Sequence, residues 1–185
     1  MRMRFFCALT ALLLIVTPAL AESGLISALA TPTPAPAGVE FARDGLRLTL
    51  PAGMELLEGE ILEAYEAAVQ FDYPDTATTV LVAVDSESEA ALLLAEIETD
   101  ADCLDAAREA AESLIGDAEL AKEKQCGENR CAHFSCAIGD QTFRLYYLSD
   151  GERLLIVSAS GIRQAEIEAM LAGLGFEAEE GGILP

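Results

Sequence analysis

The sequence predicts an α+β domain: one mostly antiparallel sheet of six or seven strands with helices packed on its faces. Two observations support this class. Short apolar runs with alternating or β-branched character are interrupted by segments of helical spacing. The second half then holds four consecutive strand-like runs separated by short turns, which is typical of a meander. Strands that follow one another through short turns pair antiparallel, and helices cover the faces that such a sheet leaves.

Hydrophobic spacing defines the elements of the first half. Alternating leucines in residues 46–50 predict a half-buried strand, and residues 58–69 carry apolar side chains at helical spacing. The β-branched run 78–84 predicts a strand. Residues 90–97 predict a second, buried strand, although their alanines and leucines fit a helix equally well. Thr99 or Asp100 is the expected start of a helix that runs to Ile115.

The second half is a predicted four-strand meander followed by a helix. Its strands are expected at residues 118–125, 131–138, 141–148 and 153–160. Gly139-Asp140 between two alternating runs is a hairpin signal. The closing helix is expected over residues 163–174.

The N-terminus has the pattern of a cleaved export signal. Arg2 and Arg4 precede the apolar run 5–16, and Ala19-Leu20-Ala21 offers small residues at a cleavage position. The apolar run is shorter than the roughly 18–20 residues that span a bilayer. We therefore expect a signal peptide at residues 1–21, with a retained anchor as the alternative. The expected product is secreted or periplasmic and has no stable membrane span.

The rest of the chain divides by composition. Residues 22–37 are rich in Pro, Ala and Thr and predict an extended linker. Residues 38–177 form the single predicted domain, and residues 178–185 a flexible acidic tail. The chain holds 32 Asp and Glu against 11 Lys and Arg, a net charge of −21. Such a field repels phosphate backbones, so we expect no nucleic-acid partner.

Four cysteines follow the expected cleavage point, and an even number in an exported chain favours disulfides. Cys126 and Cys131 flank a segment that fits a four-residue hairpin loop, which predicts one bond. Cys136 falls on the inward face of its strand with Phe134, and Cys103 on the apolar stripe of a helix, which predicts the second. A reducing habitat would leave all four as thiols.

A family resemblance covers roughly residues 40–177. The opening Gly45-Leu-Arg-Leu-Thr-Leu-Pro-Ala-Gly, the long meander and the closing Leu174-Gly175-Phe176 resemble the PsbP-like αβα sandwich, named after an extrinsic protein of the photosynthetic oxygen-evolving complex. The chain departs from that family in its four cysteines and its acidity. The resemblance implies an exported binding or accessory module and carries no catalytic residue.

Four acidic residues have the spacing of a calcium-binding loop: Glu98, Asp100, Asp102 and Glu109. Cys103 stands where such a loop needs glycine for its sharp turn. The alternative interpretation places Glu96 and Glu98 on the exposed face of a strand and makes Thr99 and Asp102 a capping pair for the next helix. Apart from this calcium hypothesis, no cofactor is expected.

Two tyrosines and one histidine are the remaining candidates. Tyr146 and Tyr147 are adjacent on a predicted strand, so one is expected to face outward and offer a contact to a partner. His133 is the only histidine, and neither Ser135 nor Cys131 stands beside it in a recognisable nucleophile motif. We therefore expect a non-enzymatic binding or accessory module of the cell envelope or extracellular space, with an unidentified protein partner. The alternative is a carboxylate-dependent hydrolase, calcium-assisted or not, or an accessory subunit acting on envelope sugar or peptide.

Overall fold

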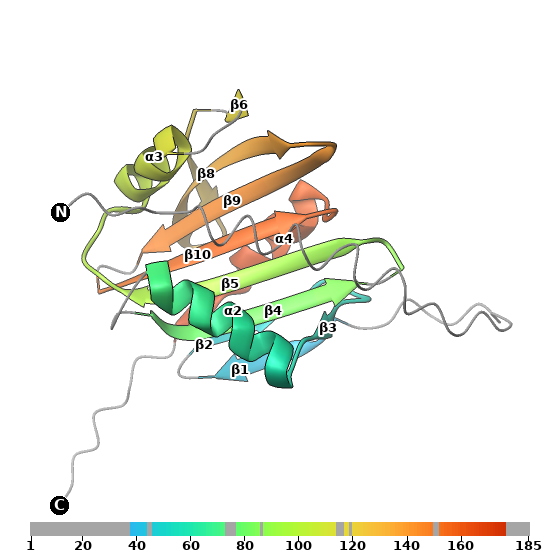
Figure 1. Ribbon diagram of the computed structural model, residues 1–185. Coiled ribbons are helices and arrows are strands. Elements are labelled where there is room, and N and C mark those ends of the chain that lie inside the picture. Colours follow the sequence, from blue (N-terminus) through green and yellow to red (C-terminus); the bar gives the residue numbers. More distant parts are fainter. Residues whose placement is uncertain are drawn as a thin grey trace, which may run out of the picture.

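Antiparallel sheets covered by helices make up the described part of the chain (Figure 1). In this computed structural model the described residues are 38–176, apart from 44–45, 73–76, 86, 114–116, 119 and 150–151. The predicted signal peptide (1–21), linker (22–37) and acidic tail (178–185) lie outside them. No helix of the described residues is long and apolar enough to cross a membrane.

The main sheet has eight strands, and its spatial order is β3–β4–β5–β10–β9–β8–β6, with β7 also paired to β8. Their bounds are β3 (Glu55–Leu56), β4 (Ala77–Asp85), β5 (Ala90–Glu98), β6 (Asp117–Ala118), β7 (Lys122–Cys126), β8 (Asn129–Ile138), β9 (Gln141–Ser149) and β10 (Arg153–Ser160). The described pairings are antiparallel. The predicted α+β class with a C-terminal meander is confirmed.

A smaller sheet and three helices complete the described elements. The sheet contains β1 (Glu40–Arg43), β2 (Leu46–Thr49) and β11 (Gly175–Phe176), with β2 in the middle. The helices are α2 (Gly59–Asp72), α3 (Cys103–Ser113) and α4 (Gln164–Ala172). Residues 90–98 form a strand, and the single strand expected at 118–125 is replaced by β6 and β7, which pair with different parts of β8.

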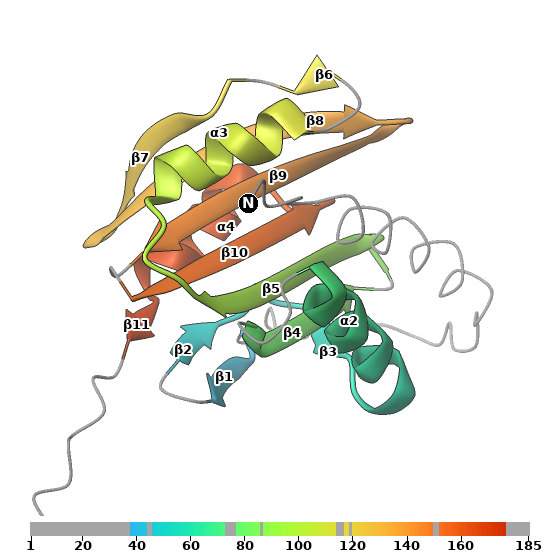
Figure 2. The same cartoon turned by 60° about the vertical axis from the view of Figure 1, so that its left-hand side comes forward.

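The two faces of the main sheet are covered by different elements. Helices α2 and α3 lie on the same face (Figure 2), where Tyr65 and Cys103 join the core. Helix α4 and the small sheet cover the other face with Ile167 and Leu46. The central strands therefore contribute to two cores, and this is why nearly all of β5 and β10 is buried.

Candidate functional site

A polar pocket opens at one end of the main sheet, where the β4–β5 turn, the β8–β9 turn and the β10–α4 connection meet. Its volume is about 390 Å³. The lining residues are Ser88, Glu89, Asp140, Gln141, Thr142, Arg144, Ser160, Gly161, Ile162 and Arg163. They come from segments far apart in the sequence, and the antiparallel order β5–β10–β9 brings them together.

The backbone of this corner is tightly constrained. Glu89 has φ 55°, a left-handed conformation that costs a non-glycine residue free energy and that clusters at functional sites. Gly161 has φ +69°, and a Cβ added there would lie 2.8 Å from Ala90 Cα. Asp85 holds the β4–β5 turn by accepting hydrogen bonds from Glu87 N at 2.9 Å and Ser88 Oγ at 2.6 Å. The hydrogen bond from Ser88 lowers the pKa of the Asp85 carboxyl.

Two arginines border the pocket and are held in different ways. Arg144 is half-buried, and its Nη1 donates to Ile162 O at 3.2 Å, which ties β9 to the loop after β10. One guanidinium carries five N–H donors, so this bond leaves others to face a ligand. Arg163 is exposed and paired with Glu166 in the first turn of α4. Its hydrogen bond lowers the pKa of the Glu166 carboxyl.

Ser160 Oγ and Gln141 Oε1 are buried and have no hydrogen-bond partner within the described structure. Ser160 pairs with Phe143, which belongs to the core under α2 and α3, whereas the register places Arg144 on the α4 side of the sheet. The Ser160 hydroxyl therefore does not share the face of Arg144. The lining also balances its charges, with Arg144 and Arg163 against Glu89 and Asp140.

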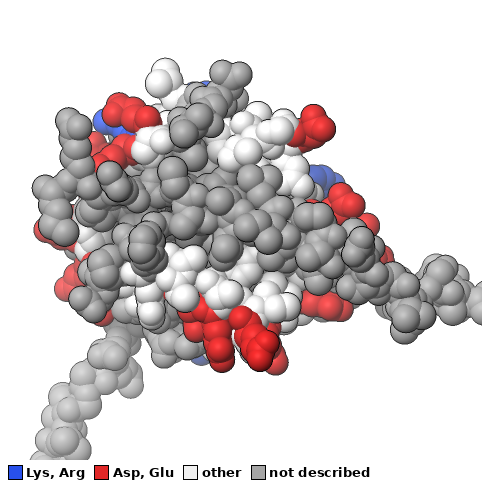
Figure 3. All heavy atoms as spheres, viewed as in Figure 1, with Lys and Arg blue, Asp and Glu red and all other residues white. Residues whose placement is uncertain are grey.

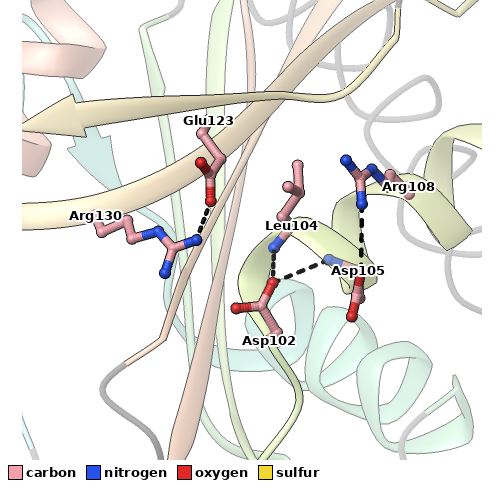
Figure 4. Close-up of polar contacts among 6 residues, drawn as sticks. All are labelled: Asp102, Leu104, Asp105, Arg108, Glu123 and Arg130. Atoms are coloured by element: carbon pink, nitrogen blue, oxygen red, sulfur yellow. Dashed lines mark hydrogen bonds and ion pairs between the residues drawn. The ribbon is translucent and has the colours of Figure 1, made fainter.

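The four residues of the calcium hypothesis do not gather around a common point. Asp102 caps helix α3: its Oδ1 accepts from Leu104 N at 2.8 Å and from Asp105 N at 3.3 Å (Figure 4). Glu98 and Asp100 are exposed before the helix, and Glu109 is exposed on it. No group of three or more His, Cys, Asp or Glu side chains among the described residues is arranged to hold a metal ion. Asp102 is thus a cap, but the expected capping pair with Thr99 is wrong: α3 begins at Cys103, and Thr99 Oγ1 accepts from Ala101 N before the helix.

The four cysteines within the described residues are buried free thiols. Cys126 and Cys131 do come together, with sulfurs 2.8 Å apart. The expected four-residue loop is wrong, however: the turn is Gly127-Glu128, Cys126 pairs with Asn129, and Cys131 lies diagonally across the hairpin. Burial raises the pKa of the Cys131 thiol, and its contact with Cys126 adds to this.

The structure does not join Cys103 to Cys136. Both side chains enter the core under α3, which confirms the predicted inward face of Cys136. Cys103, however, begins α3 beside the start of β8: burial raises the pKa of its thiol, and the nearby charge of Arg130 opposes this rise. Cys136 lies six residues beyond Arg130 along that strand, about 20 Å at the usual rise. The two cysteines share a core but stand at opposite ends of it.

Tyr146 and Tyr147 form no surface, so their proposed partner contact is wrong. Each is 0% exposed, because the sheet is covered on both faces. Tyr147 lies in the core under α2 and α3, and Tyr146 in the core on the α4 side, where His133 stacks on its ring at 5.4 Å. Burial raises the pKa of the Tyr146 hydroxyl.

Sequence reasoning missed the pocket entirely. Gly139-Asp140 marked a turn, but nothing local indicated that this turn meets the one before Ala90. The surface around the sheet carries scattered acidic groups in the view of Figure 3, so charge composition alone did not point to this corner either.

Comparison with known proteins establishes the fold and no more. No family model matches the chain, and no curated protein matches it. A crystal structure from Bacteroides thetaiotaomicron VPI-5482 is similar, with 15% sequence identity and a TM-score of 0.51. The match covers 77% of this chain and 50% of that chain, so the protein spans half the length of that structure. At this identity the likeness defines an α+β domain with an antiparallel sheet.

Proposed function

We propose that the protein is an exported, non-enzymatic binding module that holds a small polar ligand in the pocket bordered by Arg144 and Arg163. The observation that carries the proposal is the lining, in which the arginines Arg144 and Arg163 gather with Glu89 and Asp140 around one pocket. The Arg144 guanidinium donates to Ile162 O and keeps further N–H donors for a ligand, and hydrogen bonds from a charged donor are stronger than those between neutral groups. Export rests on the signal pattern of residues 1–21.

The charges of the lining favour a ligand that carries both signs. Arg144 and Arg163 would face an anionic group, and Glu89 and Asp140 a cationic one. In a chain of net charge −21, this balanced corner admits an anion that the surrounding surface repels. None of the described lining residues is aromatic, so the pocket has no platform for stacking a sugar ring. A zwitterion, such as an amino acid or a short peptide, fits this lining best.

The resemblance to PsbP-like exported domains supports an accessory role. A module of that kind works beside another component rather than transforming a substrate itself. The pocket lining supplies donors, acceptors and fixed charges, and its described residues include neither histidine nor cysteine. We therefore place the protein beside another envelope or extracellular component, with the ligand as the molecule it retains.

Calorimetric titration tests the proposal, with amino acids and dipeptides in one arm and a disaccharide and inorganic phosphate in two others. Arg163→Gln and Arg108→Gln are a matched pair. Both arginines are exposed and pair with a carboxylate three residues away, but only Arg163 lines the pocket. We expect zwitterions to bind the wild type and R108Q equally, and R163Q about tenfold more weakly. Equal weakening in both variants, or binding of phosphate or sugar alone, contradicts the proposal.

A further inference from the structure

The tip of the β7–β8 hairpin is attached to the C-terminal end of helix α4. Asn129 Nδ2 donates to Leu171 O at 3.1 Å and to Leu174 O at 3.3 Å. Carbonyls at a helix end have no partner inside the helix, so this side chain caps α4 from another element. Gly127, at the turn, packs so closely that a Cβ added to it would lie 2.8 Å from Ala172 O.

Two thiols enclose this cap. Cys126 comes directly before the turn and Cys131 two residues after Asn129, and their sulfurs are 2.8 Å apart. The residues are 2% and 0% exposed. Lys124, on the same hairpin, also pairs with Glu168 of α4. A bond between the two sulfurs would therefore close a small loop around the residues that hold the helix end.

We propose that Cys126 and Cys131 are a modification site whose oxidation to a disulfide locks the hairpin tip onto α4. In this step the two thiols lose two protons and two electrons and form one S–S bond. A disulfide of a thiol-exchange partner accepts those electrons and protons and becomes two thiols. Reduction reverses the step and frees the hairpin tip to open locally, and with it the end of α4. The proposal does not depend on what the pocket binds.

The burial of the pair determines when the bond forms. Thiolate is the reacting species, and burial disfavours it. Exchange with a partner therefore requires an open hairpin, so the bond forms as the chain folds and is then protected. Cys103 and Cys136, whose sulfurs are not brought together, remain thiols under the same conditions.

The experiment compares the protein refolded with oxidised glutathione and with a reductant. Peptide mapping identifies the bond, and hydrogen exchange follows the backbone amides of Gly173 and Leu174, which donate to carbonyls of α4. We expect a peptide linked through Cys126 and Cys131, and exchange at these amides about tenfold slower in the oxidised protein. The slower exchange after oxidation should be absent from the double variant Cys126→Ser with Cys131→Ser. It should be kept in the control Cys103→Ser with Cys136→Ser.

The wild-type comparison alone decides the proposal if a variant fails to fold. A bond that involves Cys103 or Cys136 overturns it. So does equal exchange at Gly173 and Leu174 in the oxidised and reduced proteins, because the bond would then have no effect on the helix.

Discussion

Arg153 on β10 donates a hydrogen bond from Nη1 to Oε1 of Glu96 on β5 at 2.9 Å, and the Glu96 side chain is 2% exposed. The expected placement of Glu96 on an exposed face is therefore wrong. The small sheet and α4 cover the face that alternation predicts to be exposed. A carboxylate in that position needs a positive partner to offset the loss of its hydration.

Removing Arg153 should take a positive partner from a buried carboxylate. We expect Arg153→Ala to lower the free energy of unfolding by about 3 kcal/mol, toward the low end for broken buried pairs because Arg153 keeps some solvent contact. The matched control is Glu98→Gln, two residues from Glu96 and exposed, for which we expect less than about 0.5 kcal/mol. Urea unfolding of both variants measures the difference. A loss below about 1 kcal/mol in R153A would show that Glu96 does not depend on this arginine.

Helix α3 should lose stability when its cap is removed. Asp102→Ala takes away the acceptor for Leu104 N and Asp105 N, and cap losses of this kind cost about 1 kcal/mol. Asp100→Ala is the control, since Asp100 is exposed two residues before the cap. Thermal melting followed by circular dichroism should show the drop only in D102A. A rise in the melting temperature with added calcium that D100A abolishes would instead revive the calcium interpretation.

Local sequence patterns predicted most helices and strands, because side-chain spacing and turn residues act over a few neighbouring positions. The alternation around Phe134 and Cys136 placed both on the correct face, and Gly139-Asp140 correctly marked a hairpin. The same reasoning failed for Cys103 and Cys136, because it identified the faces that meet but not how far along each element they meet. Two side chains on facing surfaces are in contact only if they also lie at the same position along their elements.

The errors at Tyr146 and in the pocket have a tertiary origin. Alternation predicts one outward tyrosine only if one face of the sheet is open, and here residues far away in sequence close it. The pocket depends on β5 and β10 being neighbours although more than fifty residues separate them. That pairing brings Gly161 against Ala90 and so assembles the corner. Nothing within a local window specifies it.

Acid should weaken the attachment of α4 to the hairpin. Burial alone raises the pKa of Glu168, but hydrogen bonds from Lys124 and Gln164 outweigh it, and the net pKa is lowered. An unfolded glutamate has a pKa of about 4.3. Because the folded pKa is lower, this stabilisation is fully present above that value and is lost as the pH falls through the folded pKa. Urea unfolding between about pH 3 and 7 should show that Glu168→Gln is less stable than wild type at neutral pH and declines less in acid. Exposed Glu109→Gln is the control, and the same acid slope in E168Q and wild type contradicts the assignment.

Two glycines with the same backbone conformation test how closely the hairpin tip packs against α4. Gly127 and Gly139 have φ +62° and +61°, but a Cβ at Gly139 would meet nothing within 4 Å, whereas one at Gly127 would lie 2.8 Å from Ala172 O. Both alanine variants pay about 1 kcal/mol for the left-handed conformation. Gly127→Ala must also displace the backbone of α4, which should add about 1–3 kcal/mol. Urea unfolding gives both values, and hydrogen exchange should show faster opening at Gly173 in G127A alone. Equal losses in the two variants would mean that the tip yields without disturbing the helix, so that capping by Asn129 rather than close packing holds α4 in place.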